Sequence, residues 1–441
     1  MWRAVFLVVL TAAVLGCDAP VGPFPPNDVY SLTLAQSRAV SSEGAKSDAA
    51  AVTEDWFGTP DHPKLPDSAA QILDLDRLVR AAGPVSSEKD GSHLGLYREH
   101  CVTCHSVDGG GAGPASLYQD PHPRNFRHGV FKWKSTLRAA KPTRADLRLV
   151  LRHGLVGSAM PSFAAIDPED DAEDDADASA GASDLDALVD YVMYLSIRGE
   201  VERRLMAAAI DELDYDDDSE AVDESLRLAA NGDSEGAQVA AEVLDRVVSQ
   251  WRAAPDQVVS VPPMPVIDGS QLAESIQRGD QIFHGKIANC VGCHGPGGNG
   301  QSVLLDFDDW GKEYSTRLGL TPSDRDDMRP FRKAGALPPR PAKPRELTLG
   351  VFRGGGDGAT LYRRIAEGIA GTPMPGVEVV DEPSGLGLTE EQVWDLVRYL
   401  QSMGSDRTGS GAASPVDPPV DSQAESGGAG QGGSGRSGGP A

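Results

Sequence analysis

Two short stretches of this sequence combine residues whose types and spacing could do chemistry. Residues 101–105 are Cys-Val-Thr-Cys-His and residues 290–294 are Cys-Val-Gly-Cys-His. In a Cys-x-x-Cys-His motif the two thiols lie on one helical turn and can add to the two vinyl groups of haem, while the histidine that follows reaches the iron. The sequence therefore predicts two covalently attached haem c groups. The residues that would hold them are Cys101, Cys104, His105, Cys290, Cys293 and His294.

Zinc binding and dithiol redox chemistry are the alternatives for a Cys-x-x-Cys pair. A four-thiolate zinc site usually joins pairs separated by a short loop, whereas these two pairs lie far apart in the chain. A redox dithiol does not need a histidine directly after each pair. Both alternatives are therefore weaker than haem attachment.

The fifth cysteine, Cys17, has a different context. Residues 4–15 form an apolar run too short to span a bilayer, and residues 14–17, Val-Leu-Gly-Cys, look like a bacterial lipobox. That resemblance implies cleavage before Cys17 and acylation of its sulfur, with an ordinary signal peptide as the alternative. We expect a membrane-anchored lipoprotein that faces the periplasm, where the maturation of bacterial c-type cytochromes would also take place.

Composition narrows the possible partners. The chain has 441 residues and a formal net charge of −26. This charge argues against nucleic acid, whose phosphates require basic patches, and against electrostatic adhesion to anionic lipids. Many of the Asp and Glu residues lie in residues 167–186 and 211–224. These segments are either solvated loops or a docking patch. If charge guides a redox partner, that partner should have a basic docking surface.

Changes in composition divide the chain into six parts. They are a lipoprotein-type signal peptide (1–17), a flexible linker (18–90), a first module (91–200), a helical and acidic connector (201–268), a second module (269–403) and a disordered Gly/Ser-rich tail (404–441). The two modules must position the chemistry, so their common features matter most.

The two modules form an internal repeat that extends beyond the haem motifs. Residues 123–132, PRNFRHGVFK, correspond to residues 344–353, PRELTLGVFR. Residues 147–161, LRLVLRHGLVGSAMP, correspond to residues 361–375, LYRRIAEGIAGTPMP. Each module then ends in an amphipathic helical pattern, and Thr389 forms a capping-box signature with Gln392.

With these elements in this order, the chain resembles two tandem class I cytochrome c domains of a bacterial respiratory chain. The resemblance implies an all-α fold in which the first and last helices of each domain cross and the haem occupies an apolar crevice. The expected fold is therefore two tandem helical domains joined by a helical, acidic connector. An insertion in the second module, around residues 310–337, has no chemistry that we can assign from the sequence.

The sixth iron ligand is the next question, and the repeat indicates Met160 and Met374, which both occur in Gly-x-x-Met-Pro. A thioether favours ferrous iron and, together with histidine, leaves no open coordination site. The iron ligands are then His105, Met160, His294 and Met374. His122, His128 and His153 also precede Met160, so a bis-histidine first haem is the alternative.

Arg124 and Arg345 occupy the repeated Pro-Arg element, where their guanidinium groups could bind haem propionates or could simply lie at the surface. The function that we expect is electron transfer between a membrane respiratory donor and an acceptor outside the cytoplasm, without enzymatic activity. A fixed subunit of a larger oxidoreductase complex is a variant of this function. The alternative is a dihaem peroxidase-like enzyme in which one haem has an open position.

Overall fold

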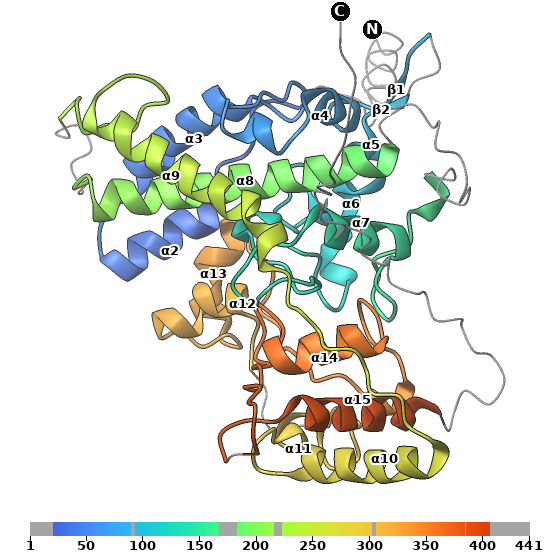
Figure 1. Ribbon diagram of the computed structural model, residues 1–441. Coiled ribbons are helices and arrows are strands. Elements are labelled where there is room, and N and C mark those ends of the chain that lie inside the picture. Colours follow the sequence, from blue (N-terminus) through green and yellow to red (C-terminus); the bar gives the residue numbers. More distant parts are fainter. Residues whose placement is uncertain are drawn as a thin grey trace, which may run out of the picture. The chain divides into compact units, whose positions relative to one another are not determined.

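The computed structural model describes residues 21–89, 93–166, 183–215, 223–301, 306–383 and 385–405. The described part is mostly helical, which confirms the predicted all-α class (Figure 1). None of its helices is both long enough and apolar enough to cross a membrane. Cys17 and the signal-peptide segment, most of the acidic residues 167–186, part of 211–224 and the tail from residue 406 lie outside the described residues.

The elements of the first half of the chain surround one long helix. In order they are α2 (Asp28–Arg38), α3 (Glu43–Phe57), η1 (Ala69–Gln71), α4 (Leu75–Ala81), β1 (Ser86–Ser87), β2 (His93–Leu94), α5 (Leu96–His100), α6 (Val102–His105), η2 (Ser116–Tyr118), η3 (Phe126–His128), α7 (Arg144–His153), η4 (Ala164–Ile166), α8 (Asp184–Asp211), α9 (Glu235–Arg252) and η6 (Ala254–Gln257). The strands β1 and β2 form a short antiparallel pair.

Helix α8 is the centre of the first core. The Ser183 side chain caps its N-terminus, and buried residues lie on all sides of the helix along most of its 28 residues. A helix that is buried all round must be covered by neighbours on every face. Helices α3, α4, α7 and α9 supply that cover (Figure 1).

The prediction that residues 18–90 form a flexible linker is wrong. Helices α2, α3 and α4 lie within this range and pack on α8. Phe57 is fully buried, with its ring centroid 5.8 Å from that of Tyr194 on α8. The backbone N–H of Asn27 donates to Glu202 of α8 over 2.9 Å. Small buried residues such as Ala45 and Ala49 allow this close packing, and their low hydrophobicity made the segment resemble a spacer.

The connector also has a different extent from that predicted. Helix α8 continues past the expected boundary at residue 200, and α9 folds back against it. The apolar pattern that predicts a helix around residues 239–247 is confirmed, because Val243, Leu244 and Val247 are buried on α9. The described residues 201–215 and 223–257 therefore contribute to the core of the first module.

The second module has its own apolar cluster. Its elements are α10 (Gly269–His284), α11 (Cys290–His294), α12 (Asp309–Glu313), η7 (Thr316–Leu318), α13 (Arg325–Lys333), η8 (Leu347–Leu349), α14 (Gly358–Glu367) and α15 (Glu390–Ser405). Helices α10 and α15, the first and last of the module, pack together (Figure 1). A Cβ atom on Gly279 would lie 2.2 Å from the carbonyl oxygen of Asp395, so this close packing requires glycine. The predicted capping box of Thr389 and Gln392 is confirmed.

The insertion at residues 310–337 packs against the N-terminal helices. Phe331 and Met328 of α13 are buried, and Val29 and Leu32 of α2 pack against their cluster. Arg203 of α8 forms an ion pair with Glu313 of α12 at 2.6 Å. The insertion therefore binds the second module to the first.

Helix α7 leads into the Met160 loop, and its N-terminus is held by a capping box. The backbone N–H of Asp146 donates to Thr143 Oγ1 over 3.1 Å, and the N–H of Thr143 donates to Asp146 Oδ2 over 2.9 Å. We expect Thr143→Ala to lower the free energy of unfolding by about 1 kcal/mol, because one backbone donor loses its acceptor. Urea denaturation measures this loss. Thr143→Ser keeps the hydroxyl and should restore stability; equal stability of all three proteins would contradict the prediction.

Candidate haem-binding sites

The two Cys-x-x-Cys-His motifs adopt matching local structures. Each lies on a short helix, α6 or α11, and each histidine is oriented by a main-chain carbonyl. The Nδ1 atom of His105 lies 3.0 Å from the carbonyl oxygen of Arg124, and Nδ1 of His294 lies 3.0 Å from that of Arg345. A carbonyl accepts a hydrogen bond from Nδ1–H, which leaves Nε2 with its lone pair available for a metal.

The glycine-rich loops that follow the two motifs make matching hydrogen bonds. The N–H of Gly111 donates to the carbonyl of His105 and that of Gly300 to the carbonyl of His294, at 2.9 and 3.0 Å. The carbonyl of Gly109 also accepts a hydrogen bond from the backbone N–H of Phe126, and the carbonyl of Gly298 accepts one from the N–H of Leu347. Gly109 and Gly298 have φ values of +68° and +65°, which favour glycine. These bonds connect each motif to its Pro-Arg element.

The two methionine loops also share one conformation. The carbonyl of Met160 accepts from the N–H of Leu155, and the carbonyl of Met374 accepts from the N–H of Ile369, at 3.1 and 3.2 Å. The methionine N–H groups donate to the hydroxyl groups of Ser158 and Thr372, both over 3.2 Å. The predicted correspondence of the two loops therefore extends to their hydrogen bonds.

The structure brings the predicted residues of the second module to one cavity of about 1300 Å³, which first-module residues such as His128 and Arg203 also line. The residues that could hold a haem there are Cys290, Cys293, His294 and Met374. Apolar side chains of α14 and α15 line the same cavity, including Leu361, Ile365, Leu396 and Leu400. Within the described residues, neither cysteine forms a disulfide. A large apolar cavity with paired thiols, an oriented imidazole and a thioether fits a covalently attached haem.

In the first module the corresponding side chains are more enclosed. His105 is 9% exposed and stacks on Phe126 with ring centroids 4.6 Å apart. Cys101 is buried in the main apolar cluster, and the partly buried Met160 packs against that cluster. Neither His105 nor Met160 lines this cavity, although other residues of the first module do. The first module nevertheless has the same groups for holding a haem as the second, namely two thiols, an imidazole and a thioether.

Burial favours the neutral form of both candidate histidine ligands. It lowers the pKa of His105 to about 4, although the hydrogen bond to the Arg124 carbonyl opposes this effect. Burial also lowers the pKa of His294. The pKa values of Cys101 and Cys290 rise to about 12 and about 11, again mainly because of burial. A neutral imidazole is the form that binds iron.

The competing histidines have other partners. The two ring nitrogens of His122 lie 3.0 and 3.1 Å from the carbonyl oxygens of Ser116 and Pro338. Nδ1 of His128 lies 3.7 Å from the Glu313 carboxylate, and burial lowers the pKa of this histidine. His153 is exposed at the end of α7. These contacts favour Met160 over histidine as the sixth ligand.

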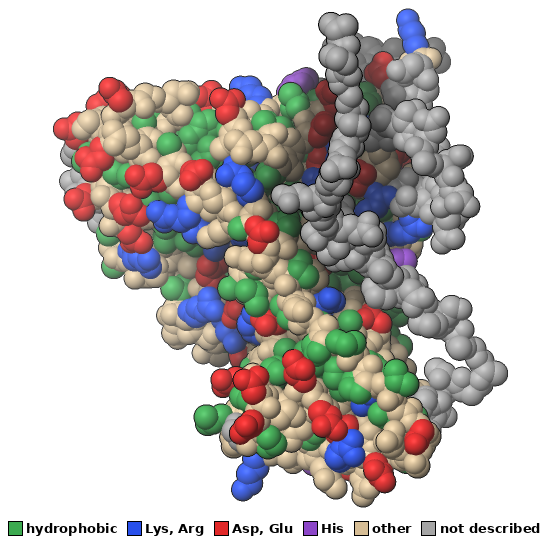
Figure 2. Space-filling model, in the orientation of Figure 1, with side chains coloured by type: hydrophobic (Ala, Val, Ile, Leu, Met, Phe, Trp, Pro, Cys, Tyr) green, Lys and Arg blue, Asp and Glu red, His purple; other side chains and the backbone are tan. Residues whose placement is uncertain are grey.

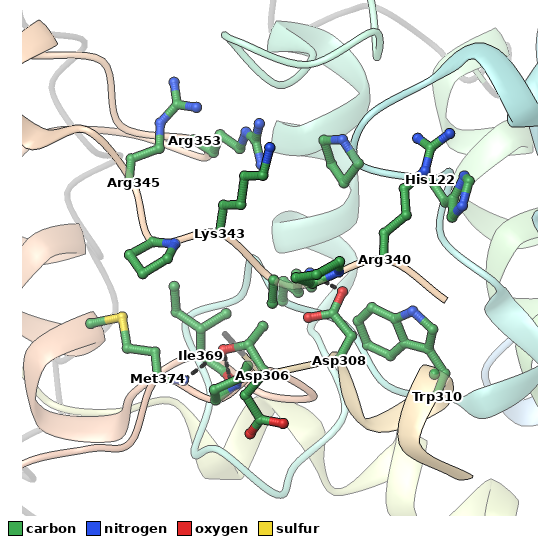
Figure 3. A pocket seen from close by; sticks show the side chains of 18 of the residues that line it. His122, Asp306, Asp308, Trp310, Arg340, Lys343, Arg345, Arg353, Ile369 and Met374 are labelled. Atoms are coloured by element: carbon green, nitrogen blue, oxygen red, sulfur yellow. Dashed lines mark hydrogen bonds and ion pairs between the residues drawn. The ribbon is translucent and has the colours of Figure 1, made fainter. Parts of the chain in front are cut away.

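In each Pro-Arg element the main-chain carbonyl of the arginine contacts the histidine of the haem motif. The sequence predicted a role only for the arginine side chains and did not indicate this contact. The Arg124 side chain lies 3.9 Å from the Trp310 ring centroid, and burial lowers its pKa to about 10. The Arg345 side chain lines the cavity, where its Nε donates to the carbonyl of Val351 over 3.1 Å. Figure 3 shows Arg345, Lys343 and Arg353 near one another, with Trp310 and Asp308 on another side. Arg345 thus lines the cavity that could hold a haem, while Arg124 is stacked on an aromatic ring.

Comparisons with known proteins agree with this geometry. A family model described as cytochrome c matches residues 94–196 and residues 276–404. A search of curated proteins found no significant match. Among solved structures, a chain of the reducing HAO-like protein complex from Kuenenia stuttgartiensis matches with 20% identity and a TM-score of 0.41. That match covers 70% of this chain and 93% of the other.

This structural match corrects one expectation from the sequence. The matched complex is HAO-like, which means that it resembles hydroxylamine oxidoreductase, an enzyme family. The prediction that this chain is not an enzyme is corrected to no statement about enzymatic activity, since the description of the matched complex conflicts with it. The TM-score and the identity are too low to assign a reaction to this chain.

Proposed function

Because the chain belongs to the cytochrome c family, we propose that it carries two haem c groups and transfers electrons through both. The first haem would be attached at Cys101 and Cys104, with His105 and Met160 as iron ligands. The second would be attached at Cys290 and Cys293, with His294 and Met374 as ligands. When bound, each haem supplies an iron that cycles between the ferric and ferrous states.

The observation that carries the proposal is the identical support of the two histidines. In both modules a main-chain carbonyl lies 3.0 Å from Nδ1, and a loop with matching hydrogen bonds presents a methionine. Such an arrangement fixes the imidazole tautomer and leaves Nε2 as the metal donor. With a thioether as the sixth ligand, the iron has no open position, which suits electron transfer.

Location and partners follow from the sequence as proposals. A lipid anchor at Cys17 would hold the protein on the periplasmic side of the membrane, near a respiratory donor. On the face drawn in Figure 2, the Asp and Glu side chains of the described residues are spread out and lie among Lys and Arg. The net charge of −26 still favours a redox partner with a basic docking surface.

The visible spectrum of the purified protein tests this function. We expect two haems per chain and low-spin bands in both oxidation states, with no change when carbon monoxide is added to the reduced protein. A thiol titration of the denatured protein should detect none of the four motif cysteines, because thioether bonds consume them. A high-spin component with a carbon monoxide shift would contradict six-coordination and favour a peroxidase-like enzyme with one open haem.

A further inference from the structure

Each module places an arginine on the methionine loop of the other module. Arg138, in the first module, donates from Nη1 to the carbonyl of Met374 over 2.6 Å and from Nη2 to the carbonyl of Thr372 over 3.0 Å. Its backbone N–H donates to Glu367 Oε2 over 2.9 Å. Arg138 therefore contacts both ends of the segment 367–374, including the main chain of the proposed ligand.

The reverse contact is weaker. Arg353, in the second module, donates from Nη2 to the carbonyl of Gly157 over 2.9 Å, three residues before Met160. The Arg345 guanidinium also packs on Gly157, because a Cβ atom there would lie 2.4 Å from its Nη2. The Met160 loop is thus contacted by the second module, but its methionine carbonyl receives no bond from Arg353.

Glycines in the loops make room for these contacts. A Cβ atom on Gly368 would lie 2.4 Å from Nη1 of Arg138, and one on Gly371 would lie 2.6 Å from the Trp310 ring. Gly157, Gly368 and Gly371 also have positive φ values, near +70°. The close approach of the opposite module therefore depends on Gly157, which belongs to the first Gly-x-x-Met-Pro pattern, and on Gly368, which lies three residues before Gly371 of the second.

We propose that Arg138 is a positioning residue for Met374, so that ligation of the second iron depends on the docked first module, and that Arg353 has the weaker reciprocal function for the Met160 loop. The proposal rests on the proposed function, because it assumes that methionine binds each iron. A planar guanidinium can hold two carbonyls in fixed directions, which a lysine ammonium cannot do with the same geometry. Its positive charge also disfavours ferric iron, and so raises the reduction potential.

The experiment compares Arg138→Gln, Arg138→Lys and Arg353→Gln in the full-length protein with both haems bound. The readouts are the NMR signals of the two iron-bound methionine methyl groups and the two reduction potentials. We expect Arg138→Gln to lower the potential of the second haem and to broaden or remove the Met374 signal, while the Met160 signal persists. For Arg138→Lys, the potential of the second haem and the intensity of the Met374 signal should lie between those of wild type and Arg138→Gln. Arg353→Gln should produce a smaller change in the Met160 signal and leave the Met374 signal in place.

Arg340→Gln is the matched control. Arg340 lies in the second module and donates to the carbonyls of Leu117 and Gln119 in the first, but it contacts neither methionine loop. It should leave both methionine signals in place. Unchanged signals and potentials in Arg138→Gln would overturn the positioning proposal and leave the proposed function intact. Absence of methionine signals from the wild-type protein would instead overturn the proposed ligands, and with them this inference.

Discussion

Replacing Met374 by histidine is expected to lower the reduction potential of the second haem by on the order of 0.2 V, a fraction of the roughly 0.8 V range that axial ligands set. An imidazole nitrogen stabilises ferric iron better than a thioether does, and the Met374 loop lies at the cavity that holds His294. A redox titration followed by visible absorbance should show a lowered reduction potential for the second haem and an unchanged potential for the first.

Two further variants make this prediction specific. Met160→His should lower the reduction potential of the first haem and leave that of the second unchanged. Met264→His changes a methionine that also precedes a proline, but Met264 is 38% exposed and does not line the haem cavity. It should shift neither potential. An unshifted second component in Met374→His would show that Met374 does not bind the iron.

Phe57→Ala is expected to destabilise the first module by about 3–5 kcal/mol, the usual cost of truncating a buried aromatic ring. Phe57 is fully buried against Tyr194, and its carbonyl accepts a hydrogen bond from the Tyr194 hydroxyl. Denaturant unfolding followed by far-ultraviolet circular dichroism measures the loss. Absorbance of the second haem should report little change, because the contact lies in the core around α8.

The control for this prediction is Leu75→Ala on the neighbouring helix α4. Leu75 is 45% exposed, so its truncation should cost less than about 0.5 kcal/mol. If Phe57→Ala were no more destabilising than Leu75→Ala, residues 21–89 would not be part of the folded core. A flexible linker would then describe this segment better than a packed set of helices.

The segments by which the two modules differ are also those that join them. Arg138 lies between the repeated Phe131-Lys132 and α7, where the second module has a shorter segment. Trp310 begins the insertion of the second module, and Arg124 and Lys132 lie over its ring at 3.9 and 4.7 Å. Lys132 also pairs with Asp308 at 2.9 Å. The repeated parts thus form the haem sites, and non-repeated residues such as Arg138 and Trp310 contact repeated residues of the other module, Met374 and Arg124.

The sequence by itself determined the chemistry of this protein and the order of its parts. The haem motifs, the Met160 and Met374 loops and helices α9 and α15 depend on residues close together in the chain, so spacing and periodicity predict them. Only the tertiary structure decided that residues 21–89 pack on α8, that Arg124 and Arg345 orient histidines through their carbonyls, and that Arg138 reaches Met374. Arg138 and Met374 are 236 residues apart in sequence. Contacts at such separations leave no local pattern, because they depend on how distant surfaces fit together after each segment has folded.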